Sequence, residues 1–392
     1  MSTASRPSRE QSWRYVYDRT YHLNRPEQTT PDFDTSGWVS TYTAEPYTHT
    51  EMREWVDDTV ARILEHAPRK VLEIGCGTGL LGNRLIPKVE AYCGLDFSVG
   101  ALQRFTLGMD PATRSSVCLL LASARDLDRV PKWDYDCVVL NSVLQYFPDT
   151  AYVREVLRRA VGLLKPPGIL FLGDVRHRDL LALHYEWREW QAAADGMTAR
   201  DAQEAAARRH RADREWSAVP HDLAALLHSV GVSHVESRLK DGIRPTEMNL
   251  FRYDAIGYVE PTCPVLSPAD WIAWKTGAEQ RIDWRARQSI GLLGVPNGRL
   301  APLLTAQGML RDARDTTSIG ELRAAVEPAA GHDDPLAAIQ ELAKAHGAEM
   351  RTNWARDRSG HTLDLAVLFG KDVPGTGPVL VGWPLTDGQS AE

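Results

Sequence analysis

A glycine-rich turn able to hold a nucleotide-like ligand ends the apolar run VLEIGCGTGLLG (Val71–Gly82). Gly75, Gly77 and Gly79 let the backbone turn sharply and approach a ligand closely. In the dinucleotide-binding fingerprint the third glycine comes one place later than it does here. Glu73, just before the turn, would repel a pyrophosphate but attract an ammonium or a sulfonium. The turn therefore favours a ligand that is cationic on one side.

A second acid, Asp96, lies in the apolar run Ala91–Phe97, about 20 residues beyond the turn. An acid at this place can accept hydrogen bonds from both hydroxyls of a ribose. Dinucleotides and adenosyl ligands share this feature, so Asp96 indicates a nucleotide without choosing between them. Taken alone, Glu73 could be a solvated strand-end carboxylate and Asp96 a turn cap. The two acids and the glycine turn in this order favour S-adenosylmethionine as the cofactor.

Further residues that could contact this cofactor follow the apolar runs or belong to the aromatic N-terminal segment. Ala124 and Arg125 follow the third run, where the adenine edge is expected. The turn at residues 141–143 follows the fourth run, beside the amino-acid end and the transferable methyl group. Trp38 and Tyr42 are expected to fold over the cofactor, since an aromatic face attracts a sulfonium. The expected cofactor-binding residues are Trp38, Tyr42, Glu73, Gly75, Gly77, Gly79, Leu80, Asp96, Phe97, Ser98, Ala124, Arg125, Asn141, Ser142, Val143 and Tyr146.

The elements that must position these residues alternate between apolar strands and helices. A helix is expected over Thr48–His66, with Thr48 and Glu51 as a capping box at its start. A closing strand pair is expected at Ser233–Leu239 and Phe251–Val259. The strands before it are expected at Lys70–Gly75, Ala91–Phe97, Val117–Ser123, Tyr135–Ser142 and Ile169–Val175. Their apolar composition predicts a parallel sheet covered on both faces, and the alternation predicts a doubly wound, Rossmann-like α/β fold.

The chain divides into three expected parts. Residues 1–47 form an N-terminal helical lid segment rich in aromatic and turn-forming residues. Residues 48–260 form the cofactor-binding domain, with a helical insertion at about 178–230 over the carboxyl edge of the sheet. Residues 261–392 form a small accessory α/β domain, and the stretch Glu260–Pro268 marks the boundary.

The composition of the chain disfavours several classes of partner. The 392 residues carry a net charge of −7, so nucleic acid is not an expected partner. The five cysteines contain no CxxC pair, so neither a metal site nor a disulfide is expected. The polar start MSTASRPSRE and the lack of an apolar run of membrane length predict a soluble, cytoplasmic protein with no membrane partner.

Long stretches of the chain, from about Tyr17 to near Gly370, resemble the methyltransferase domains embedded in nonribosomal peptide synthetases. The stretches that carry the resemblance are Tyr17-Asp18, GWVSTYT (Gly37–Thr43), Glu51–Leu64, VLEIGCGTGLL (Val71–Leu81), LNSVLQYFP (Leu140–Pro148), FLGDVRH (Phe171–His177), LFRYDA (Leu250–Ala255), VPNGRL (Val295–Leu300) and IGELR (Ile319–Arg323). The resemblance implies a class I methyltransferase fold with a small C-terminal subdomain. It also implies methylation of the amide-forming nitrogen of an aminoacyl group on a carrier protein.

Two departures from the family pattern favour a different acceptor. The chain contains no adenylation domain or carrier module, so the enzyme is expected to act in trans or on a free molecule. The family segment NELTRFRYD reads TEMNLFRYD here, so Thr246, Asn249 and Leu250 replace an amide, a hydroxyl and a guanidinium. Stand-alone bacterial relatives methylate indole C3 of tryptophan-derived diketopiperazines or tryptamine-like molecules, with closure to a pyrroloindoline. That reaction is our first expectation, and N-methylation of an amino acid, peptide or diketopiperazine, free or carrier-bound, is the alternative.

Five residues are candidates for managing the proton in this reaction: Tyr17, Asp18, Asp174, His177 and Glu247. Four of them have a structural alternative. Tyr17 and Asp18 could cap the first helix, Asp174 could fix a turn, and His177 could be an exposed helix-start residue. Glu247 keeps the family position and is expected to face the substrate. The stripe HYEWREW, with Tyr185, Trp187 and Trp190, fits helix packing better than a substrate wall.

Three rival hypotheses stay open beside the C-methyltransferase. One is the N-methyltransferase named above. Another is an NAD-dependent oxidoreductase, which the four-residue glycine spacing and Glu73 disfavour. The third is a non-enzymatic scaffold that binds the cofactor and assists a synthetase. A homodimer formed through the N-terminal segment or the tail is an open alternative to a monomer.

Overall fold

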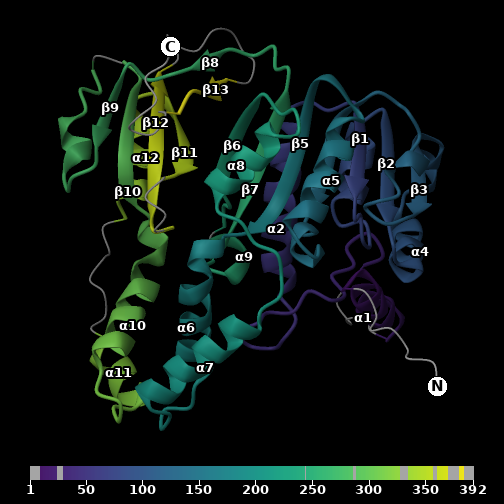
Figure 1. Ribbon diagram of the computed structural model, residues 1–392. Coiled ribbons are helices and arrows are strands. Elements are labelled where there is room, and N and C mark those ends of the chain that lie inside the picture. Colours follow the sequence, from purple (N-terminus) through teal and green to yellow (C-terminus); the bar gives the residue numbers. More distant parts are fainter. Residues whose placement is uncertain are drawn as a thin grey trace.

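A computed structural model describes residues 9–23, 30–242, 244–285, 288–326, 334–355, 360–369 and 379–383. Parts of the expected N-terminal segment 1–47 and of the expected tail domain 261–392 therefore lie outside the described residues. Two sheets stand beside each other, and a group of helices lies below them in the view of Figure 1. Among the described residues, no helix is both long and apolar enough to cross a bilayer.

The larger sheet contains seven strands in the order β3-β2-β1-β4-β5-β7-β6. These are β1 Lys70–Ile74, β2 Ala91–Asp96, β3 Val117–Leu121, β4 Tyr135–Asn141, β5 Leu164–Arg176, β6 His234–Leu239 and β7 Arg252–Val259. Strands β1 to β5 pair in parallel, and β7 runs antiparallel to both β5 and β6. This arrangement confirms the expected doubly wound, Rossmann-like sheet of a class I methyltransferase and the expected closing strand pair.

Helices cover both faces of this sheet. They are α2 His49–Leu64, α3 Gly82–Leu85, α4 Val99–Gly108, α5 Thr150–Val161 and α8 Pro220–His228. Successive residues of a strand point to opposite faces, so Leu170 packs in the core that contains α5, whereas Phe171 packs in the core that contains α2. The capping box of Thr48 and Glu51 is present at the start of α2.

One strand differs from the expected pattern. All of β3 was expected to be covered on both faces because its sequence, VCLLL, is apolar. In the structure each of its residues is partly or fully exposed, and Leu121 is 46% exposed. The reason is position, because β3 is the edge strand of the sheet.

The insertion after β5 forms two helices, α6 Leu181–Ala192 and α7 Ala199–Ala212. They lie beside α10 Ala301–Asp312 and α11 Ile319–Ala325 from the tail of the chain (Figure 1). The apolar core between these four helices includes Trp190, with Trp187 packed against it. The stripe HYEWREW therefore serves helix packing, as its spacing indicated.

The smaller sheet has the strand order β11-β12-β10-β9. Its strands are β9 Asp270–Ala273, β10 Ile290–Pro296, β11 Ala348–Trp354 and β12 Thr362–Phe369, with α12 Pro335–Ala345 between β10 and β11 in the chain. The remaining α-helices and strands of the described residues are α1 Arg9–Leu23, α9 Glu247–Leu250 and the short strand pair β8 Val265–Leu266 and β13 Leu380–Val381. Arg299 ties this tail to the larger sheet by donating a hydrogen bond of 2.7 Å to the Lys240 carbonyl.

Replacement of Gly79 by alanine should destabilise the fold at the glycine turn. Gly79 has φ = +85°, and a Cβ atom there would lie 2.3 Å from a ring carbon of the buried Phe105. We expect Gly79→Ala to lower the free energy of unfolding by at least about 2 kcal/mol, measured by urea denaturation. Gly308→Ala in α10 is the matched control, because a Cβ atom there meets no atom within 4 Å. It should raise stability by up to about 1 kcal/mol, and equal effects of the two changes would contradict this account.

Candidate active site

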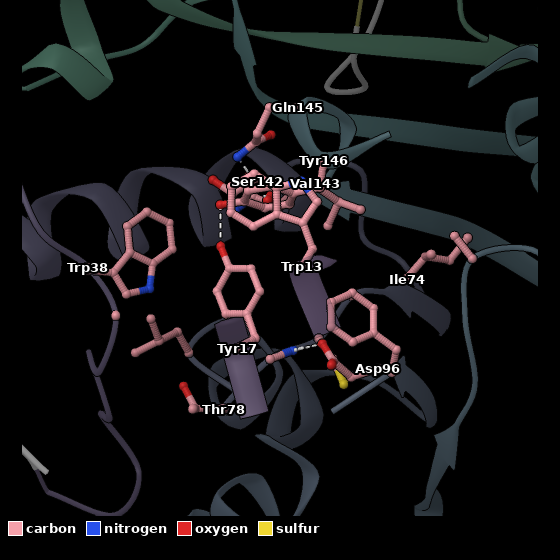
Figure 2. Close-up of a pocket in the computed structure, with 18 of the residues that line it drawn as sticks. Trp13, Tyr17, Trp38, Ile74, Thr78, Asp96, Ser142, Val143, Gln145 and Tyr146 are labelled. Atoms are coloured by element: carbon pink, nitrogen blue, oxygen red, sulfur yellow. Dashed lines mark hydrogen bonds between the residues drawn. The ribbon is translucent and has the colours of Figure 1, made fainter. Parts of the chain in front are cut away.

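A cavity of about 290 Å³ opens at the carboxyl ends of the parallel strands. It is lined by the glycine turn after β1, the end of β2, residues 122–124 after β3 and residues 141–143 at the end of β4. The carboxyl edge is where open α/β sheets bind ligands. Figure 2 shows part of this lining, with Asp96 and Trp38 on opposite sides of Tyr17.

The glycine turn has the left-handed conformation that its sequence predicts. Gly75, Gly77 and Gly79 have φ values of +80°, +53° and +85°. A Cβ atom at Gly75 would lie 2.5 Å from Val143, so the turn packs tightly on the residues after β4. A Cβ atom added at Gly77 would have the Tyr21 hydroxyl, at 3.9 Å, as its nearest neighbour. The backbone at Gly77 is therefore open to the cavity and can approach a ligand.

Asp96 is fixed beside this turn. One of its carboxylate oxygens accepts a hydrogen bond of 3.0 Å from the Gly77 amide, and the other accepts one of 2.8 Å from the Ser98 amide. Burial raises the pKa of Asp96 to about 6, although these amide hydrogen bonds act to lower it. Each carboxylate oxygen has a further lone pair, so Asp96 can still accept from two ribose hydroxyls.

Glu73 lines the cavity but is only 3% exposed. Burial raises its pKa to about 8, even though the Tyr92 hydroxyl donates a hydrogen bond to it. A cation in the cavity would favour the ionised form of this acid. The residues around the turn thus fit an adenosyl ligand with a ribose at Asp96 and a positive charge on its amino-acid half.

Helix α1 covers the cavity from outside. Its Tyr17 hydroxyl donates a hydrogen bond to the Tyr146 hydroxyl, and its Trp13 ring lies 4.7 Å from the Tyr146 ring (Figure 2). Asp18 on the same helix accepts a hydrogen bond of 2.5 Å from the Ser98 hydroxyl. Burial raises the pKa of Tyr17 well above its usual value, so its phenol stays protonated. Helix α1 is therefore held by polar and aromatic contacts with residues that follow two different strands, β4 and β2.

The far side of the cavity combines aromatic rings with charged groups, and we call it the distal wall. It comprises Trp38, Thr41, Tyr47, Trp55, Glu247 and Arg252. The rings of Trp38 and Trp55 lie 4.4 Å apart. Glu247 is buried and accepts hydrogen bonds from the Thr41 amide, the Thr41 hydroxyl and the Tyr47 hydroxyl, the last at 2.5 Å.

Asp174 lies behind the distal wall. It is fully buried and does not line the cavity, but it contacts three residues that do. It accepts hydrogen bonds from the Ser142 hydroxyl, from the Trp55 indole at 3.3 Å and from the Arg252 guanidinium at 2.5 Å. Burial acts to lower the pKa of Arg252, but Asp174 and Glu247 raise it, so Arg252 stays charged. The carboxylate of Asp174 therefore orients the wall rather than touching a ligand.

Most expected site residues meet at this cavity. Those that line it are Tyr17, Trp38, Glu73, Gly75, Gly77, Leu80, Asp96, Phe97, Ala124, Asn141, Ser142, Val143, Tyr146 and Glu247. Those that do not line it are Asp18, Tyr42, Gly79, Ser98, Arg125, Asp174 and His177.

Contacts with other residues explain why several of these side chains do not line the cavity. Tyr42 turns away, and its hydroxyl lies 3.3 Å from the His184 ring. Arg125 stacks over the Tyr152 ring at 4.3 Å. His177 is 2% exposed and packs 4.5 Å from the Trp354 ring of the smaller sheet. Burial lowers the pKa of His177 to about 3, so it is a neutral packing residue and not an exposed helix-start histidine.

Sequence reasoning missed several lining residues, among them Trp13, Tyr21, Tyr47, Glu215 and Arg252. The run SWRYVYDRTY offered a signal for the first two, because its aromatic residues recur at helical spacing. Nothing local marked Glu215, which reaches the cavity from the segment after α7. All five cysteines are free thiols. In the ranges that the structure describes, no group of three His, Cys, Asp or Glu side chains is placed to hold a metal ion.

The buried acid Glu73 should make stability fall as pH rises. Its folded pKa of about 8 lies above the ordinary value of 4.5, so the folded state retains the proton between these values and loses stability with increasing pH. Between pH 6 and pH 9, the free energy of unfolding of the cofactor-free, unchanged protein should fall by about 3 kcal/mol more than that of the Glu73→Gln variant. Urea denaturation at the two pH values measures this difference. Glu90→Gln is the control, because Glu90 is a surface partner of Arg69 with a pKa below its usual value. Equal pH dependence of Glu73→Gln and the unchanged protein would refute the assignment.

Comparison with known proteins agrees with this geometry. Residues 72–170 match a family model described as a methyltransferase domain. Chondramide synthase cmdD of Chondromyces crocatus is 33% identical over 91% of this chain and 9% of its own length. A probable non-canonical nonribosomal peptide synthetase, CymA of Salinispora arenicola, is 35% identical over 64% of this chain and 3% of its own length. The chain therefore spans less than a tenth of the length of these two relatives.

One solved structure with a similar fold is magnesium protoporphyrin IX methyltransferase from Synechocystis with bound S-adenosylmethionine. The TM-score is 0.43 and the sequence identity is 14%, over 66% of this chain and 100% of that chain. The sheet order, the glycine turn, Asp96 and the matched domain agree with one another. The chain thus contains an S-adenosylmethionine-dependent methyltransferase domain, and most of its length is similar to a part of chondramide synthase cmdD.

Proposed function

We propose that this enzyme transfers the methyl group to indole C3 of a tryptophan-derived small molecule such as a diketopiperazine, which then closes to a pyrroloindoline. The observation that carries the proposal is the distal wall, where a buried carboxylate, Glu247, lies among aromatic rings. S-adenosylmethionine supplies an electrophilic methyl carbon on a sulfonium, so the protein has only to orient the acceptor, exclude water and manage a proton.

The aromatic part of the wall suits a flat acceptor. Trp38 and Trp55 form a tilted pair whose centroids are 4.4 Å apart, and Tyr47 lies on the same wall. An indole gains apolar burial and stacking against such rings, about 0.5–1.5 kcal/mol per aromatic pair beyond area burial. Ser142 and Val143, at the end of β4, are the neighbouring residues on the cofactor side. An indole on the distal wall would therefore face the methyl group.

The charge of Glu247 suits the indole N–H. When C3 forms its bond to the methyl carbon, the sulfonium carbon–sulfur bond breaks and positive charge develops on the indole nitrogen. A carboxylate that accepts from this N–H makes a hydrogen bond that strengthens as the charge grows, which is the condition for transition-state stabilisation. Attack of a diketopiperazine amide nitrogen on C2 then closes the ring, and the amide proton is released. The donors from Thr41 and Tyr47 hold Glu247 in place for this role.

A second candidate is N-methylation of an amino acid, a peptide or a diketopiperazine. It is favoured by the relatives, since CymA and dtxS1 of Metarhizium robertsii are both named nonribosomal peptide synthetases. The latter is 34% identical over 60% of this chain and 3% of its own length. The same carboxylate could hold an amine N–H of such a substrate.

Product structure separates the two candidates. The enzyme is incubated with ¹³C-methyl-labelled cofactor and the diketopiperazine of tryptophan, and the product is analysed by NMR. C3 methylation places the label on a quaternary carbon next to an aminal CH, whereas N-methylation places it on nitrogen. The diketopiperazine of phenylalanine is the matched acceptor without an indole. The proposal fails if the label appears on nitrogen, or if both acceptors are methylated equally.

Neutralising Glu247 should slow methyl transfer without weakening cofactor binding. We expect Glu247→Gln to lower kcat/KM for the indole acceptor by about 10- to 100-fold, the value of one hydrogen bond to a charged group. Affinity for S-adenosylhomocysteine, measured by calorimetry, should stay within about twofold. Glu236→Gln is the control, because Glu236 is also buried and paired with Arg238 but does not line the cavity. A similar loss in both variants would count against a role of Glu247 at the acceptor.

Neutralising Asp96 should weaken cofactor binding, in contrast to neutralising Glu247. Asp96→Asn keeps the shape of the side chain but replaces a carboxylate acceptor with an amide. We expect affinity for S-adenosylhomocysteine to fall by about 10- to 100-fold. Asp126→Asn provides the comparison, because Asp126 caps the neighbouring Ser123 amide at 2.9 Å but does not line the cavity. Unchanged affinity of Asp96→Asn would show that Asp96 does not bind the ribose.

A further inference from the structure

Two adjacent strands end in residues whose backbones are left-handed although neither is glycine. Ser142, after β4, has φ = +55°, and Asp174, near the end of β5, has φ = +63°. Such conformations cost about 1 kcal/mol or more each and persist only where the surroundings enforce them. The Ser142 amide donates to the Gly173 carbonyl at 3.0 Å, and the Ser142 hydroxyl donates to the Asp174 carboxylate. The two strained residues therefore hold each other in place beside the cavity.

The backbone of Asp174 is held from the other side by Asp254. The Asp174 amide donates a hydrogen bond of 2.8 Å to the Asp254 carboxylate. The pairing of β5 with β7 shifts register between Leu172 and Val175, so the sheet itself does not fix this amide. Asp254 is fully buried and does not line the cavity.

Two buried cations keep Asp254 ionised. Lys240 contacts one carboxylate oxygen at 3.0 Å and Arg62 contacts the other at 3.1 Å. Burial acts to raise the pKa of Asp254, but Lys240 and Arg62 hold it below the usual value. The Lys240 ammonium also lies 5.6 Å from the centroid of the Trp55 ring. The ion cluster thus contacts the Trp55 ring of the distal wall and the Asp174 amide behind that wall.

We propose that Asp254, held by Lys240 and Arg62, is a positioning residue for methyl transfer, which it serves by fixing the Asp174 amide. Through Asp174 it orients Ser142, Trp55 and Arg252, which line the cavity. The inference rests on the proposed function, because it assumes that the acceptor lies on the distal wall. Hydrogen bonds from residues behind a functional site hold its groups in the productive orientation. In metal sites, loss of such a hydrogen bond lowers affinity or activity by about 10- to 100-fold, and we take this as the expected scale.

The test compares two variants that differ in whether residue 254 can accept hydrogen bonds from the Asp174 amide and from Arg62. Asp254→Asn/Lys240→Met and Asp254→Leu/Lys240→Met each lose one negative and one positive charge, but only asparagine can still accept from the Asp174 amide. We expect kcat of the leucine variant to be about 10- to 100-fold below that of the asparagine variant. KM for the cofactor and affinity for S-adenosylhomocysteine should agree within about twofold, since Asp96 and the glycine turn are unchanged. Equal kcat values in the two variants would overturn the proposal.

A second readout does not depend on the acceptor. Amide hydrogen exchange, followed by mass spectrometry, should be faster at residues 171–177 in the leucine variant than in the asparagine variant. Strand β10 serves as the internal reference and should exchange equally in both. If the unchanged enzyme methylates neither indole nor amine acceptors, the proposed function fails, while exchange at residues 171–177 still decides whether Asp254 fixes this segment. Equal exchange at residues 171–177 would overturn the positioning role.

A single substitution covers the case in which the leucine variant does not fold. Lys240→Met leaves Asp174 and Asp254 in place and removes one of the two cations that contact Asp254. We expect it to lower kcat about 3- to 10-fold with unchanged affinity for S-adenosylhomocysteine. Asp58→Asn is its control, because Asp58 pairs with Arg62 at 3.0 Å in the same cluster but does not contact Asp174. The same kcat in Lys240→Met as in Asp58→Asn would contradict the proposal.

Discussion

The site depends on the left-handed glycine turn that follows β1. Because β1 lies between β2 and β4 in the sheet, this turn meets the ends of both neighbours. The Gly77 amide donates a hydrogen bond to Asp96 at the end of β2, and Gly75 packs on Val143 beyond β4. A side chain at Gly75 would separate the turn from the residues after β4, so one backbone conformation sets the distance between Asp96 and the end of β4.

The part of the site that follows from local backbone chemistry could be predicted from the sequence. The glycine turn, Asp96 and the strand ends that line the cavity are short segments whose residue types require a particular conformation or place. Strand β11 has the polar sequence AEMRTNW and is recognisable only through its pairing with β12.

Residues whose position depends on distant elements could not be predicted. His177 follows a cavity strand in sequence, but Trp354 of β11 covers it. Asp174 occupies the expected strand end, yet contacts from Trp55 and Arg252 place it behind the wall instead of in the cavity. Glu215 shows the reverse, since it is remote from the motifs but lines the cavity. Sequence spacing locates a strand end, whereas tertiary packing decides which side of the wall each side chain occupies.

The two ends of the cavity treat buried acids differently. At the cofactor end, burial raises the pKa of Glu73 to about 8 and that of Asp96 to about 6, so these acids are partly or largely protonated near neutral pH while the cavity holds no cation. At the distal wall, Arg252 lies beside Asp174 and supplies a permanent positive charge. A cationic cofactor would supply the positive charge that the cofactor end lacks, and this charge would favour ionisation of the buried acids. Binding of a cation in this cavity and loss of a proton from Glu73 are therefore expected to be linked, so the bound cation would reduce the free-energy cost of ionising this buried acid.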